Sequence, residues 1–136
     1  MKYIYNKLVR DKIPQEINNV EGRKADYRIL NDEEYIKELD KKLLEEAHEF
    51  IEEHSIEELG DLMEVIFSIM KLEKIETNEV EKSRIDKKNK KGGFDNKIYL
   101  NFVEQDKPDA IKKIDKEGSS GFLESISKYV EVLYIR

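Results

Sequence analysis

Four carboxylates near the middle of the chain form two pairs with the same spacing. Glu46 and Glu49 are three residues apart, and so are Glu58 and Asp61. On an α-helix, residues three apart rise by about 4.5 Å along the axis, so both side chains of a pair can converge on one point beside the helix. Two facing pairs would offer only oxygen ligands, which suit Mg²⁺ and also Mn²⁺. We therefore predict that these four acids hold a divalent metal ion.

Convergence of these acids would be unfavourable without a cation. At about 6 Å and an effective dielectric constant of about 20, each like-charge pair costs roughly 3 kcal/mol, and a divalent ion removes this cost. Zinc is poorly supported, because the chain has no cysteine and only two histidines, without an HExxH motif. We expect His48 to be packed or exposed and His54 to lie in a loop.

The acids require two neighbouring helices that face each other. Apolar residues recur at helical spacing from residue 31 to about 53 and again from Ser55 to about Glu76, with a short linker between the two segments. Such a linker predicts an antiparallel helix pair. Asn31 and Glu34 have the spacing of a capping pair for the first helix. The apolar positions are Ile36, Leu39, Leu43, Ala47, Phe50 and Ile51 in the first segment, and Leu59, Leu62, Met63, Ile66, Phe67, Ile69 and Met70 in the second.

Helical-wheel positions separate the acids of this region. At about 100° per residue, Glu46 falls on the border of the first apolar arc, Glu58 inside the second, and Asp61 at the edge of the second. A buried carboxylate without a partner costs several kcal/mol or becomes protonated, so Glu58 requires an explanation. One explanation is a capping box with Ser55, and the other is metal binding. Solvent exposure explains the remaining acids, Glu45, Glu52, Glu53, Glu57 and Glu64, and partly explains Glu49.

Other helices are expected on both sides of this pair. Pro14 suits the first turn of a short helix over residues 14–20. A more polar helix is expected from Thr77 or Asn78 to the KNKKGGF stretch, where Gly92 and Gly93 allow the positive φ of a helix C-cap.

Two segments have the alternation typical of strands. KADYRIL (24–30) and KIYLNFVE (97–104) are expected to pair as a small flanking β ribbon. Residues 1–104 are therefore predicted to form one mainly α domain, an antiparallel helical bundle with this ribbon. Residues 105–136 differ in composition and are expected to be a C-terminal appendage.

Composition limits the partners of the chain. The 136 residues carry a net charge of −6, which argues against broad binding to nucleic acid or to anionic membranes. No apolar run approaches the length of about 20 residues that a membrane span needs, and the N-terminus lacks the apolar stretch of a signal peptide. We expect a cytoplasmic protein. The hydrophobic content of 38% is low, so helical faces left uncovered in a monomer favour a homodimer or a higher homo-oligomer.

Basic residues in two motifs could bind phosphate beside a metal ion. Lys7 and Arg10 lie in KLVRDK, and Lys91 lies in KKGGF. Phosphate groups are commonly held by a metal together with Arg and Lys. The alternatives are a solvated charge run for the first motif and a helix end for the second. A P-loop is excluded, since no GxxxxGK[ST] motif is present.

Several motifs together resemble a known family. EEAHE (45–49) and EELGD (57–61) look like the ExxE and ExxD signature of the all-α nucleoside triphosphate pyrophosphohydrolases, the MazG-like and phosphoribosyl-ATP pyrophosphohydrolase group. YNKLVRDKIP, ADYRIL, LLEEAHEF, IEELGDLMEVI and KKGGF, in that order, resemble one compact subgroup of it. The resemblance covers residues 1 to about 104. Only eight residues separate Glu49 from Glu58, fewer than in the larger MazG-type members.

The resemblance implies a helical bundle, generally dimeric or higher, that uses Mg²⁺ to cleave a nucleotide between its α and β phosphates. It implies Glu46, Glu49, Glu58 and Asp61 as metal ligands, with Glu45 as an additional acid. We expect water to attack the anhydride, with Glu46 orienting or deprotonating it. The expected role is house-cleaning of the nucleotide pool. The alternatives are a helical interaction module without catalysis and a degenerate family member that binds nucleotide or metal without turnover.

Overall fold

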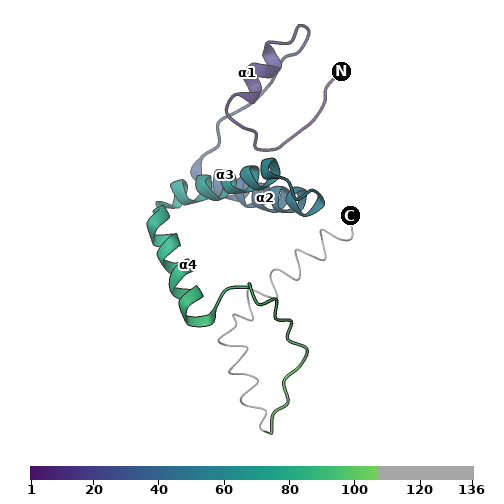
Figure 1. Cartoon of the computed structure of the whole chain (residues 1–136). Coiled ribbons are helices and arrows are strands. Elements are labelled where there is room, and N and C mark those ends of the chain that lie inside the picture. Colours follow the sequence, from purple (N-terminus) through teal and green to yellow (C-terminus); the bar gives the residue numbers. More distant parts are fainter. Residues whose placement is uncertain (107–136) are drawn as a thin grey trace. The chain divides into compact units, whose positions relative to one another are not determined.

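A computed structural model describes residues 1–106, and most of the predicted C-terminal appendage, from residue 107 onward, lies outside this range. The described part is mainly helical. Within residues 1–106, four α-helices follow one another, α1 (Ile13–Asn18), α2 (Asp32–Glu52), α3 (Ile56–Glu73) and α4 (Thr77–Lys91). Helices α2 and α3 run side by side (Figure 1). None of the helices within residues 1–106 is long and apolar enough to cross a membrane.

The pair of α2 and α3 confirms the predicted helices and their caps. Asn31 Oδ1 accepts a hydrogen bond from the backbone N–H of Glu34 at 2.9 Å and begins α2. Ser55 Oγ accepts one from the backbone N–H of Glu58 at 3.1 Å and begins α3. Because three residues separate the two helices, the chain reverses its direction between them.

Contacts between α2 and α3 bury a small core. Leu39, Val65 and Met70 are buried, and half-buried side chains surround them, including Leu43, Leu44, Ala47 and Phe50 on α2 and Leu62, Ile69 and Leu72 on α3. Ile51, which the wheel places on the apolar arc, is instead 53% exposed. Ile51 lies one residue before the end of α2 and next to the linker, where the first turn of α3 does not cover its side chain.

Helix α3 also carries a second apolar face that the described residues leave exposed. Its members are Ile56, Leu59, Met63, Ile66 and Phe67, each at least 40% exposed. Their spacing of three or four residues places them along one side of the helix. The apolar residues of α3 are therefore divided between the face that contacts α2 and a face open to solvent.

The ends of α3 and α4 are set by residues with positive φ. Lys74 adopts the left-handed conformation at φ 57°, and Ile75 N–H donates to the carbonyl of Met70 at 2.9 Å, so α3 ends at Glu73 and not at about Glu76. Helix α4 ends at Lys91, and Gly92 follows it with the predicted positive φ, 88°, and a hydrogen bond from its N–H to the carbonyl of Lys88 at 2.8 Å.

The predicted β ribbon is absent from residues 1–106. Neither 24–30 nor 97–104 forms a strand. The alternating residues Ile98, Leu100 and Phe102 are all mostly exposed. Alternation shows that a segment could cover one face of a sheet, but a strand also requires a neighbour to pair its backbone groups.

Residues Met1–Lys87 form one compact unit, and a second unit begins at Lys88. In the first unit, α1 begins with Pro14 in its first turn, as expected. Asn18 Oδ1 then accepts a hydrogen bond from Ala25 N–H at 2.7 Å, which ties the segment after α1 back to the helix. The candidate site lies wholly within this unit.

Candidate metal centre

Three of the four predicted metal ligands lie together. Glu46 on α2 and Glu58 and Asp61 on α3 each offer one carboxylate oxygen, and these oxygens all lie within 4.8 Å of one another. All three side chains are half-buried. We call Glu46, Glu58 and Asp61 the acid triad. Its position on the contact between the two helices is the arrangement that the i, i+3 spacing predicts.

Glu49, the fourth predicted ligand, is exposed and does not belong to the triad. Its negative charge nevertheless contributes to raising the pKa of both Glu46 and Glu58, so its carboxylate is close to the triad. Glu49 therefore lies at the solvent-facing rim of the cluster.

The cap at Ser55 accounts for the backbone of Glu58 but not for its carboxylate. A capping box would need the Glu58 side chain to accept a hydrogen bond from Ser55 N–H. That N–H instead donates to the carbonyl of Glu53 at 2.7 Å. The two explanations of Glu58 thus apply to different atoms, because its N–H donates to the capping residue Ser55 while its carboxylate joins the triad.

Burial and mutual repulsion raise the pKa of two triad members. Partial burial is the largest cause for Glu46, where Lys42 opposes the increase and the charge of Asp61 adds to it. Partial burial is again the largest cause for Glu58, followed by the charge of Asp61. The ionised triad is therefore under electrostatic stress that a proton or a cation would relieve.

The donor set of the triad fits a hard divalent cation. It supplies three carboxylate oxygens and neither nitrogen nor sulfur, which matches the preference of Mg²⁺ and Mn²⁺. The histidines lie elsewhere, as expected. His48 Nε2 is 3.6 Å from Glu52 Oε1, and the His54 ring, in the linker, lies 4.5 Å from the Phe50 ring.

Two predicted phosphate contacts are placed at the edge of the cluster by the segment that precedes α1. Arg10 Nη2 donates to Asp61 Oδ1 at 2.8 Å. Lys7 Nζ lies 3.4 Å from Glu45 Oε1. Both cations therefore contact carboxylates in this structure. Lys91, the third predicted contact, is the last residue of α4 and belongs to the second unit.

Glu45 differs from the triad because basic residues surround it. Burial alone would raise its pKa, but Lys42 and Lys7 together bring the pKa below its ordinary value. Glu45 is not a member of the triad. Its carboxylate serves as a partner for lysines at the margin of the site.

Sequence reasoning missed Lys42. Its Nζ lies 3.3 Å from Glu45 Oε2 and 3.9 Å from Glu46 Oε1, and the side chain is only 18% exposed. The available signal is its spacing, since Lys42 precedes the two acids by three and four residues on one helix. Lys42 partly offsets the negative charge of the cluster from the α2 side.

Comparison of the chain with protein-family models, with curated proteins and with solved structures gives no match. A function is therefore inferred from the EEAHE and EELGD motifs and from the geometry of the acid triad.

Proposed function

We propose that the chain is a Mg²⁺-dependent nucleotide pyrophosphohydrolase. It cleaves the α–β phosphoanhydride of a nucleoside triphosphate, or of a related nucleotide, to a monophosphate and pyrophosphate. The observation that carries the proposal is the convergence of Glu46, Glu58 and Asp61 from two helices, with carboxylate oxygens within 4.8 Å of one another. The resemblance of the ExxE and ExxD motifs to MazG-like and phosphoribosyl-ATP pyrophosphohydrolases supports the same reaction, with house-cleaning of the nucleotide pool as its role.

Each residue of the site has a distinct part in the proposed mechanism. Glu58 and Asp61 would hold Mg²⁺, with Glu49 available at the rim. When bound, the metal would neutralise phosphate charge and make a coordinated water more acidic. Glu46 accepts the proton of the attacking water, since partial burial raises its pKa toward the range useful for a general base. Arg10 and Lys7, which lie in the segment before α1, bind phosphate oxygens of the nucleotide.

The exposed apolar face of α3 supports a homodimer or a higher homo-oligomer. Only Leu39, Val65 and Met70 are buried within residues 1–106, a small core for two helices of this length. A second copy that covers Leu59, Met63, Ile66 and Phe67 would complete a helical bundle and enlarge that core. Light scattering coupled to size exclusion measures the mass, and a monomer at micromolar concentration would contradict this part of the proposal.

The reaction is tested by pyrophosphate release from a panel of canonical and damaged nucleotides and phosphoribosyl-ATP, with and without Mg²⁺. We expect release from at least one substrate only when Mg²⁺ is present. Glu46→Gln should lower the rate by about 100-fold or more, the usual contribution of a positioned general base. Glu58→Gln should also lower the rate, because it removes a metal ligand. Glu64→Gln is the matched control, because Glu64 is exposed on the same helix as Glu58.

Other outcomes of this assay identify the alternatives. Nucleotide or metal binding by calorimetry, without product by phosphorus NMR, would identify a binding protein that lacks turnover. A melting temperature that does not change with Mg²⁺, together with no release, would favour a helical interaction module that uses the exposed face of α3.

A further inference from the structure

Arg10 makes a contact across the fold with one member of the acid triad. It lies 51 residues before Asp61 in the sequence, yet its Nη2 donates to Asp61 Oδ1 at 2.8 Å. The carbonyl of Arg10 accepts a hydrogen bond from Ile13 N–H at 3.0 Å, so its backbone is held at the entrance to α1. The side chain is 62% exposed. The backbone of Arg10 is therefore held in place, whereas the exposed guanidinium can leave Asp61 at little cost.

The guanidinium contacts Asp61, one of the three residues that the triad offers to a divalent cation. An arginine and a divalent cation on one carboxylate repel each other, so each weakens the binding of the other. Asp61 is also the triad member whose charge raises the pKa of both other members, Glu46 and Glu58. The positive charge of Arg10 thus relieves repulsion within the triad, as a metal ion would.

We propose that Arg10 is a built-in counter-cation of the acid triad, which binds Asp61 when no divalent cation is present and leaves it when one binds. The inference depends on the metal site of the proposed function. It adds the order of events, in which metal binding comes before the contact between Arg10 and phosphate. Once released, the guanidinium is available to a phosphate group beside the metal. Metal and phosphate then bind cooperatively, and each increases the affinity for the other by the same factor.

Lys7 provides a matched comparison for Arg10. It lies on the same segment, carries the same charge, and pairs at 3.4 Å with Glu45, which is not a triad member. General electrostatic attraction predicts that removal of either cation strengthens metal binding to a similar extent. Direct competition for Asp61 predicts an effect for Arg10 alone.

The first test is a Mn²⁺ titration of the full chain without nucleotide, followed by electron paramagnetic resonance. We expect Arg10→Gln to bind Mn²⁺ about fivefold more tightly than wild type, the size expected when an exposed ion pair no longer competes. Lys7→Gln should change the affinity less than twofold. Arg10→Lys, which keeps the charge, should stay near wild type, and circular dichroism confirms that each variant is folded.

The second test observes the side chain itself. In nitrogen–proton NMR spectra of the wild type, the Arg10 Nε–H signal, assigned by its loss in Arg10→Lys, should move toward the position of a free arginine with the same midpoint as metal binding. Magnesium is the probe here, because it is diamagnetic. A signal that stays in place while the metal binds would overturn the release of Arg10.

The possible failures are distinguishable. Unchanged or weaker Mn²⁺ binding in Arg10→Gln, or equal strengthening in Lys7→Gln, would overturn the counter-cation role and leave the metal site intact. Absence of Mn²⁺ binding in wild type and Arg10→Gln alike would overturn both. Tighter binding in Arg10→Gln, with no pyrophosphate release by the wild type from any substrate, would support the counter-cation and overturn the proposed reaction.

Discussion

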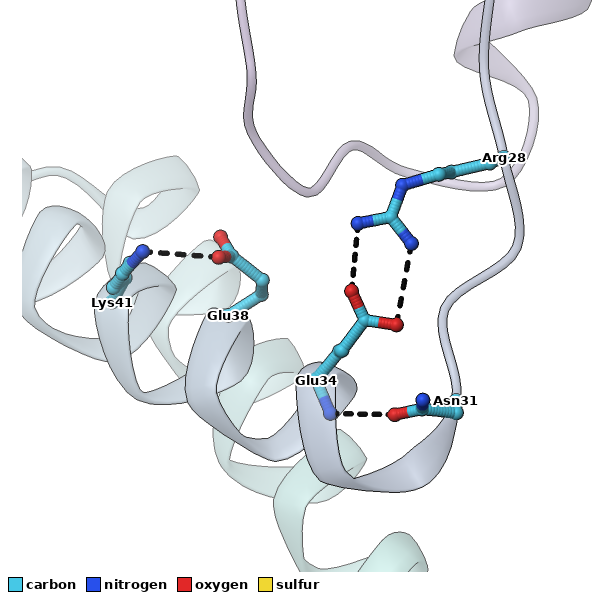
Figure 2. Close-up of polar contacts among 5 residues, drawn as sticks. All are labelled: Arg28, Asn31, Glu34, Glu38 and Lys41. Atoms are coloured by element: carbon cyan, nitrogen blue, oxygen red, sulfur yellow. Dashed lines mark hydrogen bonds and ion pairs between the residues drawn. The ribbon is translucent and has the colours of Figure 1, made fainter.

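The first turns of α2 and α3 place a glutamate at the same position with opposite results. Glu34 follows its capping residue Asn31 by three residues, and Glu58 follows Ser55 by three, and both donate their backbone N–H to the cap. The carboxylate of Glu34 is bound by Arg28 through two hydrogen bonds of 3.2 and 2.7 Å (Figure 2). The carboxylate of Glu58 instead lies with Glu46 and Asp61.

The pKa values follow from these surroundings. The hydrogen bonds from Arg28 lower the pKa of Glu34, although slight burial opposes them. Burial and neighbouring acids raise the pKa of Glu58. At the start of α4, the carboxylate of Glu79 has a third kind of partner, because its Oε2 accepts a hydrogen bond from the backbone N–H of Glu76 at 2.9 Å. The capping position therefore fixes the backbone, whereas the tertiary neighbours decide what the carboxylate does.

The largest expected effect that separates Glu34 from Glu58 is stabilisation by Mg²⁺. At 100 times its Kd, a ligand that binds only the folded state adds about 2.7 kcal/mol to the free energy of unfolding. Wild type and Glu34→Gln should both show this gain in urea unfolding, because Glu34 is outside the triad. Glu58→Gln should lose most of it at the same Mg²⁺ concentration. Equal gains in the two variants would show that the two glutamates do not differ in metal binding.

Sequence patterns predicted those features of the two helices that depend on residues close together in the chain. Helix α2, the start of α3, both caps and the C-cap of α4 depend on residues within a few positions of one another, and the structure confirms them. The early end of α3 at Lys74 escaped prediction, because a non-glycine residue in the left-handed conformation leaves no mark in the sequence.

Contacts between distant residues were harder to predict. The i, i+3 spacing and the short linker predicted that Glu46, Glu49, Glu58 and Asp61 converge, and the structure brings together all of them except Glu49. The same signals could not place Arg10 on Asp61, because the segment before α1 has no periodic pattern that fixes its path. The β ribbon failed for the same reason, as alternation in 97–104 does not identify a partner strand.

A smaller effect is expected at the fifth residue after each cap, which is Ile36 on α2 and Gly60 on α3. A Cβ added at Gly60 would meet no atom within 4 Å in the described part of the chain. Gly60→Ala should therefore raise the free energy of unfolding by about 0.5–1 kcal/mol, measured in urea, because alanine favours the helix. A loss of stability in Gly60→Ala would contradict this expectation, because it would mean that the added methyl group meets neighbouring atoms. If Gly60→Ala gains stability but loses activity, substrate or a second copy uses the space beside Gly60.

The smallest effect is the pH dependence of stability, and its sign differs between the two glutamates. Glu34 has a folded-state pKa below its ordinary value of 4.5, so its contribution is present above pH 4.5 and is lost as the pH falls through the folded-state pKa. Glu58 has a folded-state pKa above 4.5, so its ionised form destabilises the fold near neutral pH. Protonation relieves this as the pH falls toward 4.5. In metal-free urea unfolding from about pH 7 downward, Glu34→Gln should be less stable than wild type at neutral pH and converge with it in acid.

Glu58→Gln should behave in the opposite way in the same experiment. It should be more stable than wild type near neutral pH, because it removes a charge from the repelling triad, and this advantage should shrink as the pH approaches 4.5. Glu64→Gln is the control, because it removes one negative charge from an exposed position on the same helix, outside the triad. A Glu58→Gln variant less stable than wild type at neutral pH would contradict the effect of burial and repulsion that raises the pKa of Glu58. In an Arg10→Gln background the advantage of Glu58→Gln should be larger than in wild type, because the repulsion within the triad then lacks its counter-cation.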